Sequence, residues 1–104
     1  MRYEIIFAPD ADQALRKIRA YDRVAVLEAI ERHLRHEPTR ASKRRVKILR
    51  DMRHPRYRLR IGDLRVFYDV DPGQVEIVAV VFRAEAAEWL ARWGIRIEQE
   101  GGSS

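Results

Sequence analysis

Alternating apolar and polar positions over residues 57–68 predict two β-strands joined by a tight turn at Gly62-Asp63. On the first strand arginines fill every second position between apolar residues, and on the second strand Arg65 lies among apolar residues. If the apolar rows of both strands cover the core, the arginines lie together on the other, exposed side of the hairpin. These residues are Arg56, Arg58, Arg60 and Arg65. Like charges on neighbouring strands repel one another, so this face favours an anionic ligand.

The remaining apolar spacing predicts a strand over residues 2–8 and two helices, over residues 9–20 and 22–36, with Asp22 as the N-cap of the second. We expect the two helices to form an antiparallel hairpin, because their connection is short. The apolar stripe of the first helix consists of Ala11, Ala14, Leu15 and Ile18, and that of the second consists of Val24, Leu27, Ile30 and Leu34.

In the second half, residues 46–49 are either a short edge strand or the start of the next strand, and residues 53–55 are expected to form a loop. Residues 75–82 are apolar on both faces apart from Glu76, as in a central strand. If Val78, Val80 and Phe82 pack under the helices, Arg65 and Arg83 lie on the same face of the sheet. Residues 84–93 form a third helix, which ends at Gly94. Its apolar stripe consists of Ala86, Trp89, Leu90 and Trp93.

The order β-α-α-β-β-β-α predicts an α+β fold, with a mostly antiparallel, twisted sheet. The helical hairpin packs on one face of the sheet, and a short C-terminal helix follows the last strand. We expect one domain over residues 1–94 and a flexible tail over residues 95–104. The chain lacks cysteine, an apolar run long enough to span a membrane and a signal-peptide pattern, which predicts a cytoplasmic protein.

Basic residues are concentrated in the middle of the chain. The net charge is +5 over 104 residues, but residues 40–65 alone contain eleven basic and two acidic side chains. Such clustering is typical of a surface that binds a polyanion, and the alternative is an ordinary solvated surface. We expect nucleic-acid contacts from Lys43, Arg44, Arg45, Lys47 and Arg56.

The hairpin sequence YRLRIGDLRVFY, residues 57–68, resembles the signature of the RelE/ParE superfamily of bacterial toxins. The following turn, apolar strand and basic residue before the last helix extend the resemblance to about residues 2–93. It implies a toxin that a cognate antitoxin, encoded beside it, holds inactive in a toxin–antitoxin hetero-oligomer.

RelE-like members of the superfamily cut mRNA on the ribosome by attack of a 2′-hydroxyl on the adjacent phosphate, without a metal or cofactor. By position, the resemblance assigns the catalytic basic residues to Arg58, Arg60, Arg65 and Arg83. We therefore predict a ribosome-dependent mRNA endoribonuclease. In these enzymes the basic groups bind phosphate and stabilise the charge of the transition state.

Two alternatives stay open. ParE-like members inhibit DNA gyrase by binding, and two features favour this activity: arginine at positions 58 and 60, where many of the nucleases have lysine, and Trp89, where some have tyrosine. Indole has no titratable oxygen that could accept a proton. In the other alternative, the protein is an inactive relative whose basic face binds only its antitoxin.

The histidines add one candidate. His54 precedes the basic hairpin and has a side chain suited to proton transfer, so it is a possible general base. His33 and His36 are three residues apart on the second helix, but no third ligand is evident and we predict no metal site. The tryptophans of the last helix are either core residues or part of a groove for the antitoxin.

Overall fold

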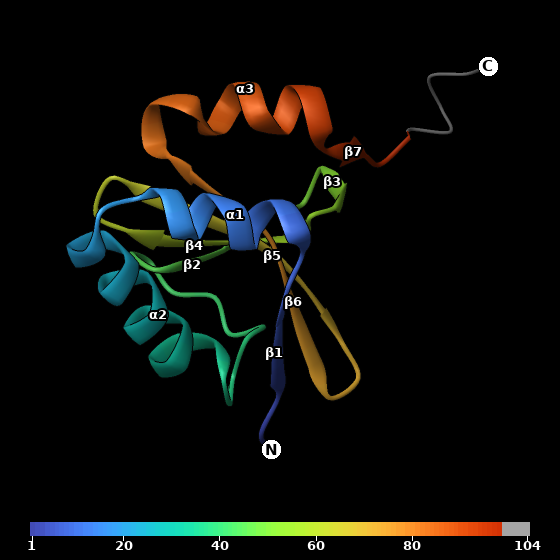
Figure 1. The fold of residues 1–104 in the computed structure, drawn as a ribbon. Helices are drawn as coiled ribbons and strands as arrows, with labels where there is room; N and C mark the ends of the chain where they lie inside the picture. Colours follow the sequence, from blue (N-terminus) through green and yellow to red (C-terminus); the bar gives the residue numbers. More distant parts are fainter. Residues whose placement is uncertain (99–104) are drawn as a thin grey trace.

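A five-stranded sheet forms the centre of the computed structural model, which describes residues 1–98 (Figure 1). The strand order is β1-β6-β5-β4-β2, and only β1 runs parallel to its neighbour, β6. The predicted α+β fold with a mostly antiparallel sheet is therefore confirmed. In chain order the elements are β1 (Glu4–Phe7), α1 (Pro9–Lys17), α2 (Ala20–Leu34), β2 (Val46–Ile48), β3 (Met52–His54), β4 (Tyr57–Ile61), β5 (Leu64–Asp71), β6 (Gln74–Phe82), α3 (Arg83–Trp93) and β7 (Ile95–Arg96).

The predicted hairpin is formed by β4 and β5. Ile61 pairs with Leu64, so Gly62 and Asp63 make a two-residue turn, and Gly62 has a φ of 55°. Glycine adopts this left-handed backbone without steric cost, which is why it occupies the first turn position. On one face of β5 the buried Tyr68 stacks on Tyr57 with ring centroids 5.3 Å apart, and its hydroxyl donates a 2.6 Å hydrogen bond to the carbonyl of Pro38.

Helices α1 and α2 form the predicted helical hairpin and cover one face of the sheet (Figure 1). The stripe predicted for α1 is confirmed, whereas the stripe predicted for α2 is partly wrong. Val26 is buried together with Ile30 and Leu34, while Val24 and Leu27 are 53% and 40% exposed. Both stripes share Ile30 and Leu34, so helical spacing alone did not distinguish them. The helix also begins at Ala20, before the predicted cap Asp22.

The last long strand changes its alternation at a β-bulge. Phe67 pairs with Ala79 but the next residue, Tyr68, pairs with Ile77, which leaves Val78 as an extra residue in β6. A bulge shifts the side-chain alternation by one residue. The prediction that Val78 lies under the helices together with Val80 and Phe82 is therefore wrong. Val75, Ile77 and Val80 are the residues of β6 in this core, and Phe82 is 43% exposed.

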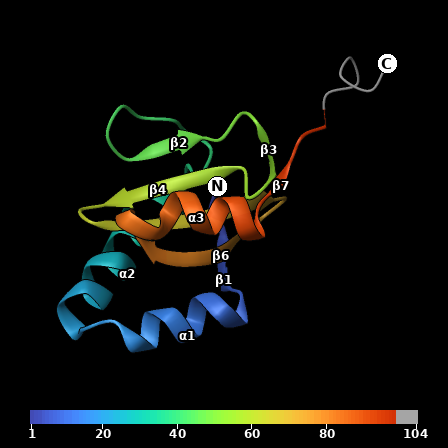
Figure 2. The same ribbon diagram turned by 90° about the horizontal axis from the view of Figure 1, so that it is seen from above.

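The opposite face of the sheet has a second, smaller core under α3. The buried Phe67 stacks on Trp89 of α3 with a centroid distance of 5.1 Å. Figure 2 shows α3 lying over the central strands, on a different side of the sheet from α1. Trp93 is 63% exposed and so departs from the predicted stripe. The full cluster consists of Leu49, Met52, Phe67 and Ala79, with Val81, Ala86, Trp89 and Leu90 packed against it.

Gly94 ends α3 as predicted, but for a different physical reason. Its φ of −75° is open to any residue, so no left-handed cap is present. A Cβ atom on Gly94 would lie 2.3 Å from the Cε of Met52 and 2.7 Å from the carbonyl oxygen of Leu90. Close packing on the second core therefore explains the glycine.

Two expectations near the ends of the second core need correction. Residues 53–55 were expected to form a loop and residue 95 to begin a flexible tail, but β3 (Met52–His54) pairs with β7 (Ile95–Arg96) in a small antiparallel sheet. Arg96 also forms an ion pair with Asp51 at 2.7 Å. The rest of the expected tail, residues 99–104, lies outside the described residues. Within residues 1–98, no helix is long and apolar enough to cross a membrane.

The turn between α1 and α2 is held by Arg23. Its Nε donates to the carbonyl of Leu15 and its Nη2 to those of Arg16 and Ile18, each at 3.0 Å. These bonds satisfy carbonyls at the end of α1 and place a positive charge at the negative end of the helix dipole. Arg23→Ala is expected to lower the free energy of unfolding, measured in urea, by about 1–3 kcal/mol. Arg16→Ala, which removes only an exposed pair with Asp12, is expected to change it by less than about 0.5 kcal/mol. Equal effects would contradict this role.

Candidate functional site

Four arginines from three elements converge where the β4–β5 hairpin turns. Arg58 and Arg60 lie on β4, and Arg60 pairs directly with Arg65 on β5. Alternation places all three on the face of the sheet that carries the second core. Arg83 is the first residue of α3, and its backbone N–H donates to the carbonyl of Asp63 in the hairpin turn at 2.6 Å. The turn therefore fixes the start of α3 beside the arginine face. These four residues are called the arginine cluster below.

Arg65 is the most constrained member of the cluster. The prediction that it lies on an exposed face is wrong, because its exposure is only 7%. Its Nη1 donates to the carbonyls of Gly62 at 2.8 Å and Leu64 at 2.9 Å, which fixes the guanidinium at the turn. Burial lowers the pKa of Arg65, and the positive charges of the other three cluster arginines lower it further, against a smaller opposing effect of Asp63. The other three guanidinium groups are therefore close enough to Arg65 to repel it.

Arg58 is also a partly buried cation that a neighbouring arginine repels. Its side chain is half-buried, and its Nε is buried without a hydrogen-bond partner among residues 1–98. Burial lowers the pKa of Arg58, and the charge of Arg60 lowers it further. Among residues 1–98, no member of the arginine cluster has a carboxylate oxygen within 4.0 Å. The cluster is thus a concentration of donors and positive charge that the described part of the chain does not neutralise, and a phosphate group satisfies both needs.

The basic surface continues beyond the cluster onto β2, at the edge of the sheet. Lys47 of β2 pairs with Arg58, and it lines a shallow groove together with Lys43 and Arg50. The remaining predicted nucleic-acid contacts, Arg44, Arg45 and Arg56, are exposed like Lys43 and Lys47. Charges spread over an exposed edge of this kind attract a polyanion from a distance without fixing its register.

His54 lies apart from the arginine cluster. Its Nδ1 contacts Oδ2 of Asp69, whose Oδ1 accepts a 2.7 Å hydrogen bond from the backbone N–H of Arg56. Asp69 is four residues beyond Arg65 on the same strand, which is about 13 Å along the sheet. Phe67 and its stacked partner Trp89 lie between the two positions. The structure therefore does not bring the candidate base together with Arg65.

The sequence suggested Asp69 only as a possible partner of Arg65 or Arg83 and not of His54, although the hairpin contained the signal. Given a two-residue turn at Gly62-Asp63, counting back along both strands pairs Tyr57 with Tyr68 and so brings Arg56 beside Asp69. A carboxylate at that register lies next to the end of β3, which carries His54. Its burial and its partners, not its residue type, distinguish it from the other acidic side chains.

Comparison with known proteins identifies related toxins. Residues 5–87 match the family described as the ParE toxin of the type II toxin–antitoxin system parDE. The chain is similar to a solved structure of the RelBE2 toxin–antitoxin complex from Mycobacterium tuberculosis, with 28% identity over 80% of this chain and 100% of that chain and a TM-score of 0.67. A RelE–RelB complex from Pyrococcus horikoshii, at 22% identity, shares the fold with a TM-score of 0.57 over 80% of this chain and 97% of that chain. No curated protein sequence matches the chain.

Proposed function

We propose that this chain, which belongs to the ParE toxin family of type II toxin–antitoxin systems within the RelE/ParE superfamily, cleaves mRNA on the ribosome through its arginine cluster. We further propose that a cognate antitoxin neutralises it in a hetero-oligomer, because the similar structures from M. tuberculosis and P. horikoshii are complexes of toxin and antitoxin.

The arginine cluster is the observation that supports RNA cleavage. In the proposed reaction, the 2′-oxygen of one nucleotide attacks the adjacent phosphorus, forms a cyclic phosphate and displaces the 5′-oxygen of the next nucleotide. Negative charge increases on the phosphoryl oxygens in the pentacoordinate transition state. Guanidinium groups of Arg58, Arg60, Arg65 and Arg83 donate hydrogen bonds to those oxygens and offset this charge.

Proton transfer is assigned to groups outside the cluster. Guanidinium stays protonated in proteins and is a poor general base, even where burial lowers its pKa as at Arg58. His54 is held by Asp69 at the other end of the hairpin. We propose that the proton of the 2′-hydroxyl passes to solvent or to a group of the ribosome, that the departing 5′-oxygen takes up a proton from the same surroundings, and that the four arginines act through charge and positioning.

Inhibition of DNA gyrase is the second candidate, and the family match over residues 5–87 favours it. The environment of Trp89 points the same way, because its ring is stacked on Phe67 in the second core and has no titratable group to offer. In this alternative the arginine cluster is a contact surface for the enzyme–DNA complex, and no bond is broken.

Metabolic labelling after induction without antitoxin distinguishes the two candidates. Ribonuclease activity predicts that methionine incorporation falls within minutes, before thymidine incorporation does. Arg60→Ala is expected to prevent this fall, because it removes one of the groups proposed to bind the phosphate. The variant is expected to fold normally, since Arg60 is exposed and belongs to neither core. Arg92→Ala, an exposed arginine on α3, is the matched control and is expected to leave toxicity unchanged. A primary loss of thymidine incorporation with DNA damage would reject the ribonuclease and support the gyrase inhibitor.

A further inference from the structure

A pocket of about 230 Å³ lies between α2 and the end of β4, beside the arginine cluster. Its lining includes three arginines and one carboxylate: Arg32 and Glu28 from α2, Arg45 before β2, and Arg60 from β4. None of these four residues has an oppositely charged side chain within 4.0 Å among residues 1–98. Ala25 and Ala29 of α2 contribute small side chains to its wall, which leave the space open.

The pocket adjoins the arginine cluster, because Arg45, Arg60 and Arg65 lie side by side across the sheet. The N–H of Arg60 donates to the carbonyl of Arg45 at 2.8 Å, which extends the β2–β4 ladder by one position. Arg60 in turn pairs with Arg65 on β5. Three arginines therefore follow one another across adjacent strands, at a spacing of about 4.8 Å per strand. Arg45 is the last of this row, and it lies where the sheet meets α2.

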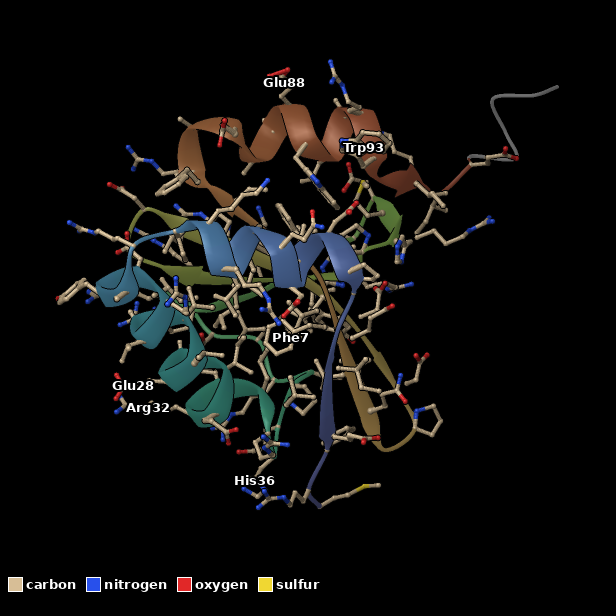
Figure 3. All side chains as sticks on the ribbon, in the orientation of Figure 1. Phe7, Glu28, Arg32, His36, Glu88 and Trp93 are labelled. Atoms are coloured by element: carbon tan, nitrogen blue, oxygen red, sulfur yellow. The ribbon has the colours of Figure 1, made fainter. Side chains whose placement is uncertain are left out.

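A partly buried histidine reports the electrostatic character of the pocket. His33 of α2 lines it, and burial lowers the pKa of His33, with further lowering by the charges of Arg45 and Arg32. Within residues 1–98, Glu28 is the one acidic residue that lines the pocket, and it lies with Arg32 at the outer side of α2 (Figure 3). The positive charge of the pocket therefore exceeds what this carboxylate offsets.

We propose that this pocket is a second phosphate subsite, which holds the backbone of a nucleotide flanking the one bound at the arginine cluster. Arg32 and Arg45 bind its phosphate, and Arg60 contributes to both sites. The strand of RNA then crosses the edge of the sheet from β5 to α2. This inference rests on the proposed ribonuclease function, because it assigns the path of the same substrate.

The salt dependence of RNA binding tests the subsite. The probe is a labelled single-stranded RNA oligonucleotide that carries 2′-deoxy nucleotides and so resists cleavage. Arg32→Ala/Arg45→Ala is expected to reduce the slope of log affinity against log salt concentration by about 0.7, the contribution of one single-strand phosphate contact. Glu28→Gln removes the repulsive carboxylate and is expected to tighten binding about threefold. Arg2→Ala/Arg92→Ala loses the same charge from exposed positions outside the pocket and is expected to leave the slope unchanged.

Two further outcomes separate failure of the subsite from failure of the proposed function. An unchanged slope for Arg32→Ala/Arg45→Ala, with a reduced slope for Arg60→Ala, would reject the subsite alone. Unchanged slopes for all variants would reject RNA binding at both places. Independently of RNA, inorganic phosphate is expected to raise the pKa of His33, followed by NMR of its ring protons, because a bound anion offsets the charges of Arg32 and Arg45. An unmoved His33 titration would overturn the anion site itself.

Discussion

Replacing Arg58 with methionine is expected to lower RNA cleavage by about 100-fold and to raise the free energy of unfolding by about 1 kcal/mol. The two effects have one cause. In the free toxin the Arg58 side chain is half-buried, its Nε has no hydrogen-bond partner in the described part of the chain, and Arg60 repels it. Methionine keeps the length of the apolar stem without the charge. In the complex with RNA, a phosphate that accepts hydrogen bonds from the guanidinium would offset this cost in stability.

Single-turnover cleavage on ribosomes and unfolding in urea measure the two effects of Arg58→Met. Arg92→Met is the matched control, because Arg92 is an exposed arginine outside the cluster, and neither property is expected to change. Loss of stability together with full activity in Arg58→Met would show that Arg58 supports the fold and does not contact the substrate.

Phe67→Ala is expected to lower the free energy of unfolding by about 3–5 kcal/mol. Phe67 is 1% exposed, and its ring is the contact on which Trp89 of α3 stacks. Helix α3 has no fully buried residue of its own, so its attachment depends on this second core. The substitution is expected to loosen α3 and with it Arg83, the first residue of the helix.

Urea unfolding followed by tryptophan fluorescence measures this change directly, because both tryptophans of the chain, Trp89 and Trp93, lie on α3. Phe67→Leu keeps an apolar side chain of similar size, and its cost is expected to be less than about 1.5 kcal/mol. A loss below about 1 kcal/mol in Phe67→Ala, with an unchanged fluorescence spectrum, would show that α3 is held by other contacts.

The parts of the fold that were predictable from sequence are those where two local signals agree. The β4–β5 hairpin combines strict alternation with a glycine turn, and its register follows from the turn length. The buried stripe of α2 was ambiguous, because Leu27 and Val26 are both at helical spacing from Ile30, three and four residues away. The bulge at Val78 lies within a continuous apolar run, where no change of pattern marks it.

The sequence predicted that the arginines of the candidate site share a face of the hairpin, but it did not predict how deeply they are buried. Alternation placed Arg58, Arg60 and Arg65 on one face, and the structure agrees. The burial of Arg65 depends on α3 and the second core, which are formed by contacts between distant segments. The pairing of β3 with β7 joins two segments of two or three residues that are about 40 positions apart, too short for a periodic pattern to appear.

The most direct test of the ribonuclease proposal is mapping of RNA ends on purified ribosomes that carry a defined mRNA. With the purified toxin, we predict new 5′ ends within the codon exposed in the ribosomal A site. These ends are expected to disappear in Arg58→Met and Arg60→Ala and to persist in Arg92→Ala. Two results would contradict the assignment of the arginine cluster as the site of RNA cleavage. One is intact mRNA at a stoichiometric concentration of folded toxin, and the other is cleavage that persists in Arg58→Met and in Arg60→Ala.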